Sequence, residues 1–404
     1  MKGNIHVAWP RSIWEDELPR LCYTAMSRCH EPKPSSPQVF LPDELIIEVL
    51  TFLPVKSLMQ FRCVCHFWNA LISDPTFKKN HQKKSERNKH LILISKKLPR
   101  GFFVDSLSVS SLVENPLLIT LGDKHCGLRD VCLKVVGSCN GLLCLHECFP
   151  PYLENWLYFY NPATKTISEE LGSFTNKYMS WFAFGYDNST DTYKVVALCQ
   201  VTSDVSVFSL GDNIWKNIQS FPEVHFPPYF CFNGGVYLSS TLNWLVLRNN
   251  IIYDRKNRKI EHYVIISLNL GTETYTQLLP PGGFDEVLLV QPTISVLMDC
   301  VCFTHDFKGI GLLIWKMMEF GVEESWTQLL KINYNNLQMY YYIHQLVPLY
   351  VSESGDTLIL INRLEGQPIL YNLKNRVTKT IVTKGKRWFY VNNYAESLVS
   401  TDGK

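Results

Sequence analysis

The sequence predicts a multidomain α+β protein with two unlike parts: a small three-helix module, followed by an all-β propeller of about six blades. The helical part is indicated by apolar residues at helical spacing between residues 41 and 77. The propeller is indicated after residue 90, where short strand-like runs alternate with turn sequences. One aromatic or apolar strand returns about every 50 residues, which is a spacing of propeller blades. These strands lie near Phe103, Tyr160, Phe208, Leu268, Trp315 and Tyr371.

The boundaries of four segments are predicted from changes in composition along the chain. Residues 1–40 predict a disordered leader, because the stretch 31–37 is rich in Pro and Ser. Residues 41–80 hold the helical module, 81–90 a linker and 91–400 the propeller. The basic run after Phe77 is expected to be a solvated helix extension or linker.

The first helix of the module is amphipathic on more than one side. Its apolar positions are Leu41, Leu45, Ile46, Val49, Leu50 and Leu53. Pro42 suits the opening of a helix and Pro54 ends it. Further helices are expected over 55–64 and 65–72. Because Ile46, Ile47, Val49 and Leu50 cover more than one face, the helix is expected to have a partner on its second side. A small bundle docked on the following domain is the alternative.

Composition excludes several classes of function. The chain has 404 residues, a net charge of +2 and 13 Cys, an odd number scattered along the chain. The near-neutral charge gives no reason to expect a nucleic acid or a membrane as the main partner. No apolar run is long enough to span a bilayer, and the N-terminus lacks the apolar centre of a signal peptide. We therefore expect reduced thiols and a cytoplasmic and/or nuclear location.

One short motif raises the possibility of catalysis. Residues 137–141 read Gly-Ser-Cys-Asn-Gly, which matches a nucleophile elbow with Cys139 in the serine position. An elbow needs a helix after the turn, whereas the run after Gly141 is short and is soon followed by two prolines. Asn140-Gly141 is a preferred pair for a tight hairpin turn. The sequence therefore favours a β-turn and predicts no catalytic residue.

Cysteine and histidine spacing indicates no metal site. Cys63 and Cys65 fall inside the helical module, and Cys300 and Cys302 alternate along a strand-like run. A zinc site needs four ligands, usually with a C-x₂₋₄-C pair, and none stands out. We expect neither a metal nor a cofactor.

Residues 41–77 resemble an F-box. The matching pieces are Leu41-Pro42, Asp43-Glu44, Leu53-Pro54-Val55-Lys56-Ser57-Leu58, Phe61-Arg62-Cys63-Val64-Cys65, Trp68, Leu71-Ile72 and Asp74-Pro75-Thr76-Phe77. The chain departs from the family at Phe52, where Arg is frequent, and at His66, where Lys is frequent. The resemblance implies a Skp-type adaptor as partner and, through it, the cullin and RING subunits of a ubiquitin ligase. It implies adaptor-binding residues at Leu41, Pro42, Leu45, Ile46, Val49, Leu50, Leu53, Pro54 and Leu58, of which Leu53, Pro54 and Leu58 support the interface.

The rest of the chain resembles the F-box-associated, kelch-like region of plant F-box proteins. The matching pieces are 137–144, 160–164, 184–187, 191–196, 234–238, 243–245 and 325–327. Each is weak alone, but their order after an F-box is specific.

Together these resemblances imply a non-catalytic substrate receptor of a Skp–cullin–F-box ligase, whose propeller binds a target protein. Candidate target-binding residues in predicted loops are Tyr229, Arg255, Arg258, Tyr340 and Tyr341, because exposed Tyr and Arg suit protein recognition. The alternative for these loops is that their aromatic residues pack between blades. The alternative for the whole chain is a propeller binding module that acts outside a ubiquitin ligase.

Overall fold

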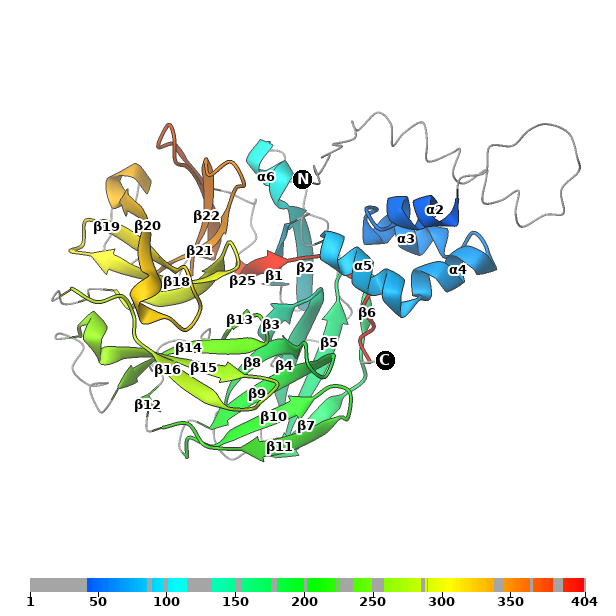
Figure 1. Ribbon diagram of the computed structural model, residues 1–404, viewed down its shortest axis with the longest axis horizontal. Coiled ribbons are helices and arrows are strands. Elements are labelled where there is room, and N and C mark those ends of the chain that lie inside the picture. The colour runs from blue at the N-terminus through cyan, green and yellow to red at the C-terminus, as the bar shows by residue number, and fades with distance from the viewer. Residues whose placement is uncertain are drawn as a thin grey trace, which may run out of the picture. The chain divides into compact units, whose positions relative to one another are not determined.

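The computed structural model describes residues 42–85, 89–97, 101–114, 133–149, 154–175, 180–199, 202–222, 224–225, 235–248, 258–284, 288, 290–337, 345–363, 366–380 and 388–402. The chain divides into two compact units, Met1–Ser85 and Glu86–Lys404. The first unit is helical where it is described, and the second consists mainly of antiparallel sheets (Figure 1). This confirms the predicted fold class of a small helical module followed by a propeller.

The helical unit contains α2 (Asp43–Leu50), α3 (Val55–Phe61), α4 (His66–Ser73) and α5 (Pro75–Ser85). Pro42 and Pro54 stand at the N-caps of α2 and α3, where a missing N–H costs nothing. In place of a proline cap, α5 has Asp74, whose carboxylate accepts the backbone N–H groups of Thr76 and Phe77.

Helix α5 corrects the expected linker. Its polar sequence suggested a solvated extension, yet Phe77, His81 and Ser85 are buried. The Nε2 atom of His81 lies 2.9 Å from the carbonyl oxygen of Leu53, so α5 closes the unit against the segment between α2 and α3. Residues 81–85 therefore belong to the helical unit and not to a linker over 81–90. Among the helices of the described residues, none is long and apolar enough to cross a membrane.

The second unit is a six-bladed propeller. Blade 1 contains β3 (Leu133–Cys139), β4 (Leu142–Phe149), β5 (Glu154–Asn161), β6 (Thr166–Ile167) and β7 (Leu171–Thr175); blade 2 contains β8 (Ser180–Asp187), β9 (Thr192–Cys199), β10 (Val205–Ser209) and β11 (Ile214–Ile218). Blade 3 contains β12 (Val224–His225), β13 (Val236–Leu238), β14 (Thr241–Arg248), β15 (Tyr263–Asn269) and β16 (Tyr275–Leu278); blade 4 contains β17 (Thr293–Leu297), β18 (Cys300–Phe307), β19 (Gly311–Met317) and β20 (Trp326–Asn333). Blade 5 contains β21 (Leu346–Val351), β22 (Thr357–Asn362), β23 (Gln367–Asn372) and β24 (Thr378–Thr380); blade 6 contains β25 (Trp388–Tyr394), β1 (His90–Lys97) and β2 (Gly101–Ser108).

The inner strands close a ring. Each inner strand contacts the next one in the order β3, β8, β13, β17, β21 and β25, and β25 contacts β3. The six strands that the sequence placed near Phe103, Tyr160, Phe208, Leu268, Trp315 and Tyr371 are β2, β5, β10, β15, β19 and β23, the third strand of each blade. The predicted period was therefore the true blade repeat.

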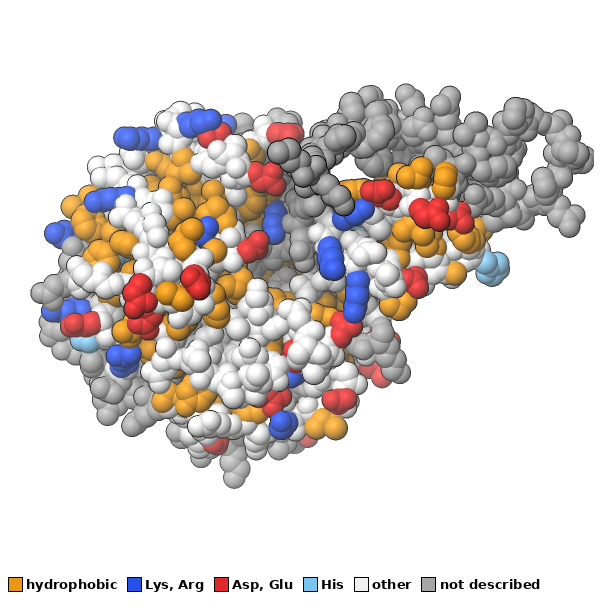
Figure 2. All heavy atoms as spheres, in the orientation of Figure 1, with side chains coloured by type: hydrophobic (Ala, Val, Ile, Leu, Met, Phe, Trp, Pro, Cys, Tyr) orange, Lys and Arg blue, Asp and Glu red, His pale blue; other side chains and the backbone are white. Residues whose placement is uncertain are grey.

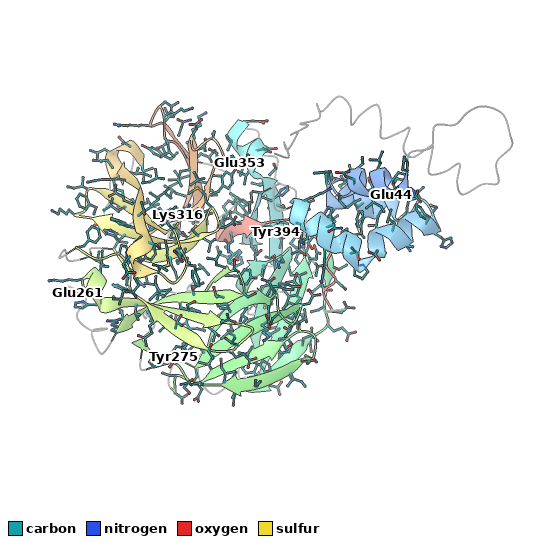
Figure 3. The ribbon with its side chains drawn as sticks, in the orientation of Figure 1. Glu44, Glu261, Tyr275, Lys316, Glu353 and Tyr394 are labelled. Atoms are coloured by element: carbon teal, nitrogen blue, oxygen red, sulfur yellow. The ribbon has the colours of Figure 1, made fainter. Side chains whose placement is uncertain are left out.

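Blade 6 is built from both ends of the propeller. Strand β25 pairs with β1 (Figure 1), and in their register Tyr394, which is labelled in Figure 3, stands opposite His90. The chain after β25 continues along blade 1, where the side-chain amide of Asn161 donates to the carbonyl oxygens of Ser397 and Val399, both at 2.9 Å. The two ends of the propeller are therefore joined by strand pairing within blade 6 and by hydrogen bonds from blade 1 to the C-terminal segment. Beyond β2, the chain forms the short helix α6 (Val109–Glu114).

Four blades join their third and fourth strands by the same five-residue turn. The turns run over 161–165, 209–213, 269–273 and 372–376, and the fifth residue is left-handed in each, with φ of 60°, 55°, 56° and 57°. In three of them the Asn that opens the turn accepts two backbone N–H groups with its side-chain oxygen. Asn suits this position because its short side chain competes for local backbone donors. The corresponding connection of blade 4 is longer, spanning residues 318–325.

Two tryptophans form hydrogen bonds to the preceding blade. In blade 2, Trp215 Nε1 donates to the carbonyl oxygen of Gly172 at 2.7 Å, and Asn213 Oδ1 accepts the N–H of Gly172. In blade 4, Trp326 Nε1 donates to the carbonyl oxygen of Leu279 at 2.9 Å, and Glu323 Oε1 accepts the N–H of Leu279. Both peptide groups belong to the outer edge of the preceding blade, so each pair links two blades.

We expect Trp326→Phe to lower the free energy of unfolding by about 0.5–1.5 kcal/mol, the value of one intramolecular hydrogen bond. Phe keeps an aromatic ring beside Phe303 but cannot donate to Leu279. Urea unfolding followed by tryptophan fluorescence and circular dichroism measures the change. Trp215→Phe should give a loss of the same size, and unchanged midpoints for both variants would show that the two bonds add nothing to stability.

Candidate functional site

Helix α2 carries two apolar stripes, one facing in and one facing out. Ile46, Leu50 and Leu53 are buried, at 7, 1 and 5 % exposure. Leu45 and Phe52 are 47 and 44 % exposed, and Val49 between them is half-buried. Residues 45, 49 and 52 are spaced i, i+4, i+7, and the hydrogen bond from Phe52 N–H to the Val49 carbonyl oxygen continues the helical turn past Leu50. We call Leu45, Val49 and Phe52 the outer stripe.

The adaptor-binding residues that the resemblance implied divide into exposed and buried ones. Pro42 and Pro54 are exposed beside it. Ile46, Leu50, Leu53 and Leu58 are buried within the chain, so they can support a surface but cannot contact a partner without unpacking. In this structure Ile46 and Leu50 therefore lie with Leu53 and Leu58 on the inner side of the unit, while Leu45 and Val49 lie on the outer side. Leu41 lies outside the described residues.

Phe52 is a candidate that sequence reasoning set aside as a peripheral departure. Its ring lies 3.8 Å from the ammonium group of Lys84, which also donates to Thr51 Oγ1 at 2.8 Å. The signal available in the sequence was its i+7 spacing from Leu45. Glu44, marked on α2 in Figure 3, places a carboxylate in the exposed first turn of the same helix.

The propeller has two distinguishable ends. Because neighbouring strands in each blade are antiparallel, the inner strands all begin at one end, which we call the loop end. The opposite end holds Tyr394 and His90, where the last strand of the ring finishes and β1 begins. Short turns join first to second strands there, such as Asn140-Gly141 in blade 1.

The segments that hold four of the five candidate target residues are flanked by residues at the loop end. Segment 226–234 follows β12, which pairs with the last residues of β14, and 249–257 follows β14 itself. Segment 338–344 precedes the inner strand β21. Tyr229, Arg255, Tyr340 and Tyr341 themselves lie outside the described residues.

The fifth candidate, Arg258, is corrected by its burial. Its side chain is only 9 % exposed, and its backbone carbonyl accepts the N–H of Leu288 at 2.7 Å. It lies against Tyr263, where burial raises the pKa of the phenol to about 12 and the positive charge of Arg258 partly opposes that rise. Arg258 is therefore packed beside Tyr263 inside the propeller and is not an exposed charge in this structure.

Cys139 lies at a hairpin, as the turn prediction required. It ends β3, and Asn140 and Gly141 take positive φ of 46° and 85° before β4 begins. Cys139 is 4 % exposed, and a strand follows the turn where a nucleophile elbow needs a helix. The elbow interpretation is therefore wrong.

Of the other described cysteines, Cys144 and Cys302 are buried in the propeller, whereas Cys63 is exposed. Burial raises the pKa of the Cys302 thiol to about 12, which opposes the thiolate form that a metal ligand needs. Within the described part of the chain, no three His, Cys, Asp or Glu side chains gather as metal ligands.

A buried ion pair joins blades 2 and 3. Asp187 is fully buried at the end of β8, and its Oδ2 lies 3.1 Å from Lys194 Nζ. Lys194 also donates to the Leu270 carbonyl oxygen at 2.6 Å and lies 3.4 Å from Glu273, both in blade 3. Burial alone would raise the pKa of the Asp187 carboxyl. Hydrogen bonds from Thr190 and Ser189, together with Lys194, outweigh burial and hold that pKa well below its usual range.

A buried histidine lies between blades 1 and 2. His146 is 4 % exposed, its Nε2 atom is 2.8 Å from Asn155 Oδ1, and its ring stacks on Phe182 at 4.2 Å. Nδ1 makes no hydrogen bond among the described residues. Burial lowers the pKa of this imidazole to about 4, with the Asn155 bond opposing the shift and the charge of Lys134 adding to it.

The described residues form a helical unit with exposed apolar side chains on and just after α2, and a second unit of six antiparallel blades arranged in a ring. Comparison with known proteins gives the family. Residues 40–80 match the F-box domain, and residues 88–401 match the F-box associated beta propeller domain. The chain belongs to the family of F-box proteins with an F-box-associated propeller.

Curated relatives agree with this assignment. The F-box/kelch-repeat protein At3g23880 of Arabidopsis thaliana is 30 % identical over 307 residues, covering 72 % of this chain and 79 % of the relative. The F-box protein CPR1 of the same plant is 25 % identical over 376 residues, covering 85 % and 84 %. Among solved structures, TolB from Acinetobacter baumannii covers 80 % of this chain and 73 % of its own at 9 % identity and a TM-score of 0.46.

Proposed function

We propose that this F-box protein is the substrate receptor of a Skp–cullin–F-box ubiquitin ligase. The observation that carries the proposal is the outer stripe of α2. Its apolar side chains remain exposed although the opposite stripe already fills the helical core, which is the arrangement expected of a helix with a second partner. The F-box match over residues 40–80 supports a Skp-type adaptor as that partner. The cullin and RING subunits would join through the adaptor.

The mechanism proposed is proximity without chemistry by this chain. The helical unit attaches the chain to the ligase, and the loop end of the propeller holds a target protein. The ligase holds the target beside the enzyme that carries ubiquitin. The lysines of the target are then present at a high effective concentration near that enzyme, so transfer no longer depends on an encounter in solution. Tyr229, Arg255, Tyr340 and Tyr341 are proposed as target contacts because the segments that hold them leave the ring at one end. The cytoplasm and the nucleus are the compartments proposed for this activity.

Adaptor binding tests the proposal. Each buried anchor of an interface contributes about 2 kcal/mol or more, so Leu45→Ser alone should weaken adaptor binding about 30-fold and Leu45→Ser with Phe52→Ser about 1,000-fold. Biolayer interferometry with a purified Skp-type adaptor measures the affinity. Both side chains are exposed, so the double variant should unfold at the same urea concentration as the wild type.

The matched control is Ile214→Ser, which removes a 62 % exposed apolar side chain from β11 of the propeller. It should bind the adaptor as the wild type does. Wild-type affinity in the double variant would refute the docking surface. A folded wild type without any adaptor affinity would instead favour a propeller module that acts outside a ubiquitin ligase.

A further inference from the structure

The connection between β19 and β20 in blade 4 departs from the five-residue turn that four other blades share. It spans residues 318–325 and exposes Met318 at 60 % and Phe320 at 42 %. Leu279, at the outer edge of blade 3, is 40 % exposed and is tied to the base of the same loop by Trp326 and Glu323. We call Leu279, Met318 and Phe320 the blade-4 patch. Single exposed apolar residues are ordinary, but two on one short loop and a third at the blade edge hydrogen-bonded to that loop need an explanation.

The loop is held in shape by its own hydrogen bonds. Ser325 Oγ accepts the N–H of Glu319 at 3.1 Å and reaches the carbonyl oxygens of Glu319 and Val322 at 3.0 and 2.6 Å. The N–H of Met318 donates to the Ser325 carbonyl oxygen at 3.2 Å. Gly321 supplies the positive φ of 90° that the bend requires. The two exposed apolar side chains are therefore presented by an ordered loop, which lowers the entropy cost of binding.

The charged residues of the loop itself have one sign. Residues 318–325 include Glu319, Glu323 and Glu324 and contain neither Lys nor Arg. Glu319 and Glu324 are exposed, whereas Glu323 is engaged with Leu279. Hydrophobic and acidic side chains lie side by side over the propeller in Figure 2. An apolar surface bordered by carboxylates is complementary to a segment that carries Lys or Arg next to apolar residues.

We propose that the blade-4 patch is a docking site for a cationic, apolar peptide segment of a partner protein. Met318 and Phe320 would bury the apolar residues of that segment, since Met adapts to varied shapes and Phe offers a large rigid face. Glu319 and Glu324 would pair with its Lys or Arg side chains at the rim. This surface stands on the outer edges of blades 3 and 4, and the proposal holds whether or not α2 binds an adaptor.

Selection from a random peptide display library against the immobilised full chain tests the proposal. We expect enriched peptides to combine Lys or Arg with aromatic or aliphatic residues. They should bind Met318→Ser with Phe320→Ser at least about tenfold more weakly, the loss of about 1.4 kcal/mol. Glu319→Gln with Glu324→Gln should weaken binding mainly at low salt, because rim charges are screened. Ile214→Ser serves as the control and should bind the peptides as the wild type does.

Three outcomes would overturn the proposal. They are a selection without any peptide above background, peptides that bind the Met318/Phe320 variant as well as the wild type, and peptides that are acidic. A separate measurement addresses the competing occupant, a second copy of this chain. Sedimentation velocity that shows self-association in the wild type and not in Met318→Ser with Phe320→Ser would assign the patch to a dimer interface instead.

Discussion

Asp187→Ala is expected to lower the free energy of unfolding by about 3–5 kcal/mol, the usual cost of removing one partner of a buried ion pair. The variant leaves the Lys194 ammonium buried, with the Leu270 carbonyl and a more distant Glu273 carboxylate as its remaining acceptors. It also removes the acceptor of the Ser189 and Thr190 hydroxyl groups. Urea unfolding at pH 7 measures the loss, and hydrogen exchange should locate it at the junction of blades 2 and 3.

Two controls separate burial from charge. Adding Lys194→Met to Asp187→Ala removes the orphaned cation and should recover part of the lost stability. Asp356→Ala breaks an ion pair with Lys374 of 2.7 Å, shorter than the 3.1 Å pair of Asp187, but its lysine is 74 % exposed. That variant should unfold at the same urea concentration as the wild type, because water solvates the charges of an exposed ion pair once the pair is broken. Equal losses for Asp187→Ala and Asp356→Ala would contradict the argument.

Mild acid should destabilise the propeller through His146. Its folded pKa of about 4 is below the ordinary value near 6.5, so between these values the unfolded chain binds a proton that the folded chain does not. The contribution is absent above pH 6.5 and opposes folding progressively as the pH falls toward 4. Between pH 7.5 and pH 5 the two pKa values give a loss of about 2 kcal/mol.

His146→Gln isolates this contribution, because Gln retains a polar group near Asn155 and does not titrate. Unfolding free energies of both proteins at pH 7.5 and pH 5 give the comparison. We expect the wild type to lose about 2 kcal/mol more than the variant over this range. Parallel losses would mean that His146 is hydrated in the folded protein and contributes nothing to acid sensitivity.

Most of the predicted fold came from the repeat of strand-like segments about every 50 residues. The third strands of most blades are apolar or aromatic because most of their residues are buried, so their spacing survives in the sequence as a period of about 50 residues. The turn at Asn140-Gly141 was equally readable, since its two positive φ values demand such residues. A helix was one of the two alternatives for the basic run that became α5, but its buried side was not predicted, because contacts such as that of His81 with Leu53 are not revealed by composition.

The candidate surfaces were predicted unevenly for a physical reason. Apolar spacing identified α2 as two-sided but could not tell its inner stripe from its outer one, since both consist of similar residues at i, i+4, i+7. Thus Ile46 and Leu50 were grouped with Leu45, and Phe52 was left out. Arg258 failed because a charged residue in a loop-like sequence was taken as exposed, whereas it lies against Tyr263. The blade-4 patch became visible only when its loop was compared with the four shared turns.

Closure of blade 6 has a consequence for biosynthesis. Strands β1 and β2 leave the ribosome early, yet their inner neighbour β25 is translated after all the other blades. At about 5–20 residues per second, the nascent chain must keep β1 unpaired on that side for tens of seconds. During this interval an edge of the sheet is open to the wrong strand. A premature stop before β25 would leave that edge open permanently, so truncated chains should be recognised by chaperones and degraded.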